Sequence, residues 1–179
     1  MAQITVLIGS PRKNGNTEML ADAFIKGAEE AGNGVTKICL AGRKVNGCLG
    51  CDYCMKNGGK CAQRDDMQQI YEELYRTDVV VLATPIYCYA ISAQLKALMD
   101  RFYATIAKPL PVTSAALLVA YGDESPHEAD VAVAHFHALL KGAGWQNGGV
   151  VTAAGVLAKG DIIGHNSLKL AEALGKNIR

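Results

Sequence analysis

Short apolar segments and longer amphipathic segments alternate along the whole chain. The apolar segments are rich in Val, Ile and Leu, as strands buried on both faces require, and cover about 2–8, 35–40, 78–84, 114–120 and 149–153. The amphipathic segments carry apolar residues at helical spacing and cover about 17–31, 65–75, 91–103, 127–142 and 167–177. Parallel strands need helical crossovers, so this order predicts an α/β fold, a doubly wound five-stranded parallel sheet in three αβα layers.

The chain has 179 residues, enough for one domain with a sizeable core. We expect a single domain over residues 1–179, with an irregular, cysteine-rich insertion at about 41–64. In doubly wound sheets the ligand lies beyond the carboxyl ends of the strands. Three loops qualify, those after Ile8, Thr84 and Ala120, and we expect Pro85 to stop the third strand.

The loop after the first strand has the composition of a phosphate site. It runs Gly-Ser-Pro-Arg-Lys-Asn-Gly-Asn-Thr over residues 9–17 and leads directly into a helix. A helix N-terminus presents free N–H groups and a partial positive charge, which together bind anions. The alternative interpretation is an ordinary small-residue loop of an α/β fold. The side-chain donors and cations of the loop are Ser10, Arg12, Lys13, Asn16 and Thr17.

The same loop excludes two common nucleotide sites. A P-loop places Lys directly before the hydroxyl residue, whereas Asn16 precedes Thr17 here. A dinucleotide site needs the spacing G-x-G-x-x-G, which the turn after Ile8 lacks. Flavin mononucleotide (FMN), which has one terminal phosphate, fits the loop.

The other two loops complete the expected site. The segment 85–92 is small, apolar and partly aromatic, and such a loop can lie against a flat ring system while its N–H groups reach the ring edge. We expect Tyr87 or Tyr89 near the ring, with surface packing as the alternative. After the fourth strand, Gly122 beside Tyr121 allows the backbone to approach the ligand closely.

Composition and charge exclude several partners. The net charge is +1 at pH 7 and no long basic run exists, which argues against nucleic acid. No apolar run approaches the length of a membrane helix. The chain enters its first strand without a leader, so we expect a cytoplasmic protein that does not bind membranes. Six cysteines in such a protein favour metal, redox chemistry or burial over a disulfide framework.

Four of the cysteines, Cys48, Cys51, Cys54 and Cys61, follow the spacing C-x₂-C-x₂-C-x₆-C. The first three resemble the start of a bacterial ferredoxin run, and the glycine-rich gap that follows gives the chain freedom to return the fourth to the same centre. Three interpretations stay open: a [4Fe–4S] cluster, a zinc site, or free or oxidised thiols. Cys88 is expected near the flavin as a packing residue.

Three motifs occur together in the chain. They are the loop 9–17, Thr-Pro-Ile-Tyr at 84–87, and Gln-Leu-Lys-Ala-Leu-Met-Asp-Arg at 94–101. The combination resembles the NADPH-dependent FMN reductase branch of the flavodoxin-like superfamily. The four-cysteine motif, followed by Asp-Asp-Met at 65–67, is similar to the iron–sulfur flavoproteins of that branch. The resemblance covers essentially the whole chain.

The resemblance implies a flavodoxin-like fold with strand order 2-1-3-4-5 and FMN at the strand ends. It implies assembly as a homodimer or homotetramer, because family members are usually dimers or tetramers. It also implies phosphate contacts from Ser10, Arg12, Asn16 and Thr17 and ring contacts from Pro85, Ile86, Tyr87 and Cys88. Further cofactor-binding candidates are Asn14, Glu18, Tyr121 and Gly122.

We therefore expect an FMN-dependent oxidoreductase that passes electrons from NAD(P)H to a flavin, a quinone or a metal centre. The flavin carries this chemistry, so we assign no catalytic residue. The alternative is an iron–sulfur flavoprotein that carries electrons from ferredoxin, with a [4Fe–4S] cluster on the four spaced cysteines. A third interpretation is a binding protein that holds FMN or zinc without turnover.

Overall fold

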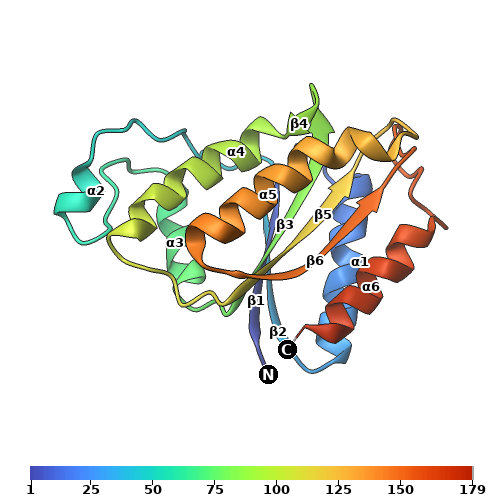
Figure 1. The fold of residues 1–179 in the computed structure, drawn as a ribbon, viewed down its shortest axis with the longest axis horizontal. Helices are drawn as coiled ribbons and strands as arrows, with labels where there is room; N and C mark the ends of the chain where they lie inside the picture. The colour runs from blue at the N-terminus through green and yellow to red at the C-terminus, as the bar shows by residue number, and fades with distance from the viewer. Residues whose placement is uncertain (179) are drawn as a thin grey trace.

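The computed structural model describes residues 1–178 and contains a twisted parallel sheet with helices on both faces (Figure 1). The predicted flavodoxin-like strand order 2-1-3-4-5 is confirmed. The five parallel strands, counted along the chain, lie in that order in the sheet. A short extra strand, β4 (Ala90–Ile91), pairs antiparallel with the end of β3 and was not expected. The parallel strands lie in the order β2 (Gly34–Cys39), β1 (Gln3–Ile8), β3 (Val79–Tyr87), β5 (Ser114–Ala120) and β6 (Gln146–Ala153).

The helices divide between the two faces of the sheet (Figure 1). One face carries α1 (Asn16–Glu30) and α6 (Asn166–Asn177), and the other carries α3 (Met67–Leu74), α4 (Ala93–Asp100) and α5 (Asp130–Ala143). Three short elements lie in the connections: α2 (Tyr53–Lys56) and the 3₁₀ helices η1 (Arg101–Ile106) and η2 (Pro126–Ala129).

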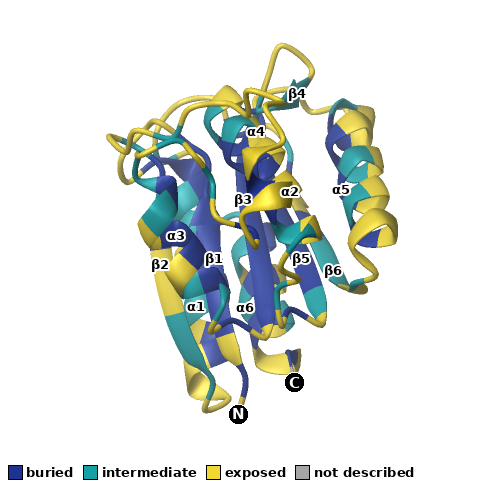
Figure 2. Cartoon of the chain, turned by 90° about the vertical axis from the view of Figure 1, so that its left-hand side faces the viewer, coloured by how far each residue is buried: buried dark blue, intermediate teal, exposed yellow. Residues whose placement is uncertain are grey.

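Each face of the sheet has its own apolar core. Along β1, Ile4, Val6 and Ile8 belong to the core under α1 and α6, and Leu7 belongs to the core under α3, α4 and α5. The central strands are therefore buried on both faces (Figure 2). Strands buried on both faces are continuous apolar runs, which is why the sequence predicts them. The packed sheet gives the loops at its carboxyl edge a fixed support.

Helices α1 and α6 touch closely enough to require glycine. A Cβ atom on Gly27 would lie 2.0 Å from Glu172 O, and one on Gly175 would lie 2.1 Å from Phe24 O. Real side chains do not tolerate such distances, so the two helices can pack this way only without side chains there. The packing fixes α6 beside α1, whose N-terminus follows the loop 9–15.

The expectation that Pro85 stops the third strand is wrong, because β3 continues to Tyr87. Strand β1 ends opposite Ala83, whereas Pro85 is still paired with Ala120 of β5. At Pro85 the strand therefore no longer pairs with β1, and a residue without an N–H group is tolerated there. As a result Ile86 and Tyr87 sit on a strand rather than on a loop.

Candidate functional site

A cavity of about 250 Å³ lies where the carboxyl ends of β1, β3 and β5 meet. All three loops expected from the sequence contribute to its wall, and a fourth segment, after β6, joins them. The lining consists of Ser10, Arg12, Asn16, Thr17, Pro85, Ile86, Tyr87, Ala120, Tyr121, Gly122, Val156 and Leu157.

The loop 9–15 brings an uncapped helix start to one end of this cavity. Gly15 occupies the cap position of α1, and no side chain accepts from the first turn. The N–H groups of that turn are thus left for an anion, beside the buried hydroxyls of Ser10 and Thr17. Ser92 Oγ donates to Gly9 O at 2.8 Å, and a Cβ on Gly9 would lie 2.6 Å from the same Oγ, so the loop is packed tightly against the start of α4.

Arg12 crosses from this loop to the segment after β6. Its Nη1 donates to Leu157 O at 3.1 Å, and the side chain is otherwise exposed. The contact holds a guanidinium at the cavity wall, where it adds positive charge to the end that already carries the helix N-terminus.

Asn16 lines the cavity, but its amide group is already engaged within the protein. Nδ2 donates to Val156 O and Ala158 O, and Oδ1 accepts from Gly160 N at 2.9 Å. An amide with both hydrogens committed has none left for a phosphate oxygen. The side chain is therefore a link between α1 and the segment after β6.

Asn14 and Glu18 lie outside the cavity lining and border a separate hollow next to Cys39. Glu18 Oε2 accepts from Asn14 N at 2.5 Å, and Asn14 has a positive φ of 52°. Glu18 Oε1 also pairs with Lys37 Nζ at 2.8 Å. Burial raises the pKa of Glu18, but the hydrogen bonds from Lys37 and Asn14 outweigh it, so the pKa lies below its ordinary value. Glu18 shapes the turn rather than facing the cavity.

The end of β3 supplies the apolar wall. Tyr87 lines the cavity, whereas Tyr89 is 73% exposed and lies outside the lining. Cys88 is exposed and also lies outside the lining, one residue beyond Tyr87. Both residues of the turn into β4 have positive φ, 48° at Cys88 and 64° at Tyr89. Left-handed non-glycine residues are costly, so this turn is held by its pairing with β3.

The segment after β6 was missed from the sequence. Val156 and Leu157 line the cavity, and a Cβ on Gly122 would lie 2.7 Å from Leu157 Cδ1. Gly122 therefore makes room for Leu157 as well as for a ligand. The rule that ligands lie beyond strand carboxyl ends applies to the last strand too, and it was the available signal.

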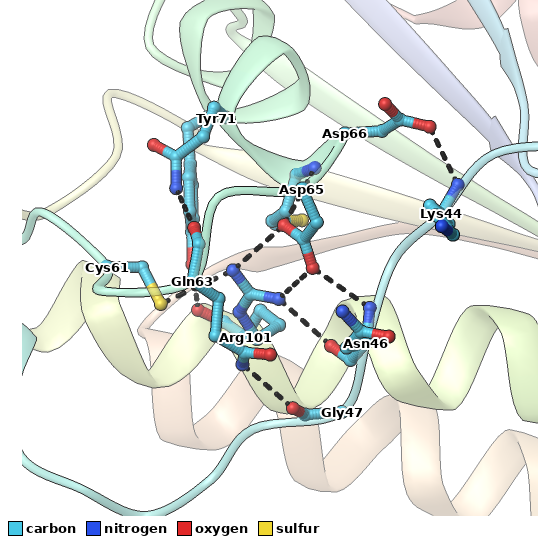
Figure 3. A network of polar contacts seen from close by, with 11 residues as sticks. Lys44, Asn46, Gly47, Cys61, Gln63, Asp65, Asp66, Tyr71 and Arg101 are labelled. Carbon is cyan, nitrogen blue, oxygen red and sulfur yellow. Dashed lines mark hydrogen bonds and ion pairs between the residues drawn. The ribbon is translucent and has the colours of Figure 1, made fainter.

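The cysteine-rich segment is closed at its base by a buried ion pair (Figure 3). Arg101, whose side chain is 1% exposed, donates from Nη1 and Nη2 to the two carboxylate oxygens of Asp65 at 2.7 and 3.2 Å. Asp65 also accepts from Asn46 N, and Arg101 Nη1 donates to Asn46 O. The chain before and after the cysteines is thus tied together. We call 44–46 with 64–66 the neck and 47–63 the cysteine loop.

The four thiols of the cysteine loop lie in different surroundings. Cys48 and Cys51 are exposed, Cys54 is buried, and Cys61 is half-buried and accepts from Arg101 Nη2 at 3.3 Å. Burial raises the pKa of the Cys54 thiol, as do the nearby Cys61 and Cys48. Within residues 1–178, no three Cys, His, Asp or Glu side chains are grouped so that they could hold a metal ion. The donor chemistry suits a thiolate centre, but this arrangement does not, so we derive no step through a metal.

Comparison with known proteins decides the family. The family model for NADPH-dependent FMN reductases matches residues 2–157. The chain belongs to the NADPH-dependent FMN reductase family. An iron-sulfur flavoprotein of Archaeoglobus fulgidus is 34% identical over 174 residues, which are 96% of this chain and 76% of that protein. Another, from Methanocaldococcus jannaschii, is 40% identical over 100 residues, which are 56% of this chain and 50% of that protein.

A solved structure supports the fold assignment. The NAD(P)H:quinone oxidoreductase from Methanothermobacter marburgensis superposes with a TM-score of 0.79 at 19% identity, covering 98% of this chain and 95% of that one. The expected family and fold are thereby confirmed, and membership of this FMN reductase family makes the chain an FMN-dependent oxidoreductase. No helix among the described residues has the length and apolar character needed to span a membrane.

Proposed function

We propose that the cavity binds FMN with its phosphate on the loop 9–17 and its isoalloxazine ring against the end of β3. One observation carries the proposal: a single cavity joins an uncapped helix start to an apolar strand end. In this proposal Ser10 and Thr17, which line the cavity, donate to phosphate oxygens, and Arg12 neutralises the phosphate charge. At the other end Pro85, Ile86 and Tyr87 offer an apolar surface to the ring.

The chain binds and orients, and the cofactor supplies the redox chemistry. When bound, FMN would supply the capacity to take a hydride from a reduced nicotinamide and to pass the electrons on. The cavity lining within the described chain contains no carboxylate, imidazole or amine. Its contribution is therefore to fix the phosphate at one end and the ring plane at the other. Tyr87 is held by the ladder with β4, so the ring-facing wall keeps its shape.

The electron donor in this proposal is NAD(P)H, and the acceptor is a flavin, a quinone or a metal centre. The family description, which specifies NADPH, supports the donor. The open wall at Tyr87, which is 38% exposed, leaves a side from which donor and acceptor can approach the ring in turn.

Flavin titration tests the proposal. The purified protein should quench the fluorescence of FMN at lower concentration than that of riboflavin or FAD, and Tyr87→Ala should shift the absorption of the bound flavin. NAD(P)H oxidation should then require both FMN and an acceptor. Equal affinity for riboflavin and FMN would remove the phosphate assignment, and an unchanged spectrum in Tyr87→Ala would remove the ring assignment.

A second candidate function is that of a ferredoxin-linked iron–sulfur flavoprotein, in which Cys48, Cys51, Cys54 and Cys61 would hold a [4Fe–4S] cluster in a loop arrangement other than the present one. The spacing of these cysteines and the name of the 34% identical relative favour it. Iron and zinc analysis of anaerobically isolated protein, with its visible spectrum, tests it. Iron with broad absorbance near about 400 nm would support the cluster, zinc without colour would support a zinc site, and metal-free protein would leave a flavin reductase with a thiol loop.

A further inference from the structure

The side chain of Asn16 makes four hydrogen bonds to one segment that is distant in sequence. Nδ2 donates to Val156 O at 3.0 Å and to Ala158 O at 2.7 Å. Oδ1 accepts from Gly160 N at 2.9 Å and from Ile162 N at 3.5 Å. Asn16 is 8% exposed, so these bonds form away from bulk water, where an unmade one is costly. We call residues 155–162 the wall loop.

The wall loop forms one side of the proposed phosphate end. Val156 and Leu157 line the cavity, and Leu157 O accepts from Arg12 Nη1 at 3.1 Å. The other hydrogen bonds that tie the loop to the strand ends lie at its first residues, where Gly155 N donates to Asp123 O and Val156 N donates to Tyr121 O. Ile162, at its last residue, is buried in the core under α1 and α6. Between these two anchors, Asn16 supplies the hydrogen bonds from α1 to Ala158 and Gly160 of the wall loop.

The amide of Asn16 can link α1 to the wall loop because its nitrogen donates hydrogen bonds and its oxygen accepts them. It stands at the first position of α1 and reaches carbonyl groups with its nitrogen and N–H groups with its oxygen. Gly160, one of the two donors, has a φ of 98°, which only glycine adopts easily. A carboxylate in place of the amide would face the carbonyls of Val156 and Ala158 without a hydrogen to offer.

From these contacts we propose that Asn16 is a positioning residue for the phosphate end of the site. It fixes the wall loop against the start of α1, and the wall loop in turn holds Arg12 through Leu157 O. Asn16 thus acts on the FMN phosphate through Arg12 and not by direct contact. This inference rests on the proposed binding of the FMN phosphate at the loop 9–17.

Asn16→Leu tests the inference, because leucine has a similar volume, adds no charge and makes none of the four bonds. The measured quantity is the ratio of the riboflavin and FMN dissociation constants, which reports on the phosphate alone. We expect the ratio to fall about tenfold, the effect of losing one well-placed charge-assisted contact. Hydrogen exchange of residues 156–162 in flavin-free protein should become faster. In an Arg12→Gln background, Asn16→Leu should change the ratio by less than about twofold, since the two act in series.

Asn33→Leu is the matched control. Asn33 also links distant segments through its amide, accepting from Ala2 N and donating to Ile178 O, next to the amino-terminal ends of β1 and β2. It should lower stability and leave the flavin ratio unchanged. If Asn16→Leu does not fold, Asn16→Ser, which has a smaller side chain and keeps one hydroxyl, takes its place.

Two results would overturn the inference: an unchanged ratio in the Asn16 variant, or an equal loss of riboflavin and FMN affinity in it, as a purely structural role would give. Failure of the proposed function is read separately, in the wild-type protein, as equal affinity for riboflavin and FMN.

Discussion

The loop 9–15 and the neck of the cysteine loop both lie between a strand and a helix, yet the charge of their arginines is balanced in one and not in the other. At the neck, Arg101 is buried and its guanidinium is matched by Asp65. At the loop 9–15, Arg12 is exposed and contacts a neutral carbonyl, beside a helix start that no side chain caps. The charge at the neck is paired, although the buried Arg101 Nε has no hydrogen-bond partner among the described residues, and the first loop is left with unpaired positive charge. A completed charge pair stabilises a fold, whereas an incomplete one is what a ligand completes.

The two regions also differ in how much of each loop is held by contacts with the rest of the protein. The loop 9–15 is short, and the side chain of Glu18 and the hydroxyl of Ser92 hold it directly. The cysteine loop is held at its neck and at Tyr103 Oη, which donates to Asp52 Oδ1 at 2.8 Å, and Cys48 and Cys51 remain exposed. The cysteine loop is thus fastened at its neck, by Tyr103 and through the buried Cys54, and the stretch that carries Cys48 and Cys51 faces the solvent.

The largest effect should follow from breaking the charge pair at the neck. Arg101→Met keeps an unbranched apolar stem without the guanidinium and leaves the Asp65 carboxylate buried without its partner, at 4% exposure. We expect a loss of about 3–5 kcal/mol in the free energy of unfolding, measured with urea. Arg43→Met, which removes an exposed guanidinium next to the neck, should change the unfolding free energy by less than about 1 kcal/mol.

The double variant Arg101→Met with Asp65→Asn sharpens the comparison. It removes the uncompensated charge and should recover part of the loss. A loss below about 1 kcal/mol in Arg101→Met alone would mean that the neck is not a stabilising charge pair and that the contrast with Arg12 does not hold.

The next effect concerns the unsatisfied charge at the loop 9–15. Arg12→Ala should weaken FMN binding by about 1.5–3 kcal/mol, the value of a charge-assisted hydrogen bond, and riboflavin binding much less. Because Arg12 is exposed, the same variant should leave the unfolding free energy within about 0.5 kcal/mol of the wild type. Arg12 would then contribute to FMN affinity and not to stability, and Arg101 would contribute to stability. A large stability loss in Arg12→Ala would contradict that division.

The sequence predicted the elements of the sheet well because each strand and helix carries its own periodic pattern. It also predicted most of the cavity lining, since strand carboxyl ends meet at one edge in this topology. Long-range side-chain contacts were beyond it. Nothing local in the sequence tells that Asn16 bonds to residues 156–162, or that Arg101 reaches Asp65 across the neck. The extension of β3 through Pro85 likewise depends on where β1 ends.

A smaller effect is expected in the reactivity of the four thiols. In metal-free protein, Cys48 and Cys51 should react with a thiol reagent about tenfold faster than Cys54, because they are exposed and it is buried. Cys61 is half-buried and should react at a rate between those of the exposed thiols and Cys54. Mass spectrometry of partially labelled protein measures each site. Equal rates at all four positions would show that the neck does not order the loop above it.

The smallest effect concerns Glu18, whose carboxylate accepts from Asn14 N in the loop 9–15, and the way its contribution to the unfolding free energy depends on pH. Glu18→Gln keeps an acceptor for Asn14 N but loses the charge that pairs with Lys37, so it should cost about 0.5–1 kcal/mol near neutral pH. The pKa of Glu18 in the folded protein lies below its ordinary value of 4.5, despite burial, because Lys37 and Asn14 favour the carboxylate. The wild-type advantage is therefore fully present above about pH 4.5 and is lost as the pH falls through the lowered folded-state value. Urea unfolding of both proteins at several pH values should give curves that converge in acid. If the difference in unfolding free energy between the two proteins stays constant with pH, the effect comes from packing. The ion pair of Glu18 with Lys37 would then not stabilise the fold.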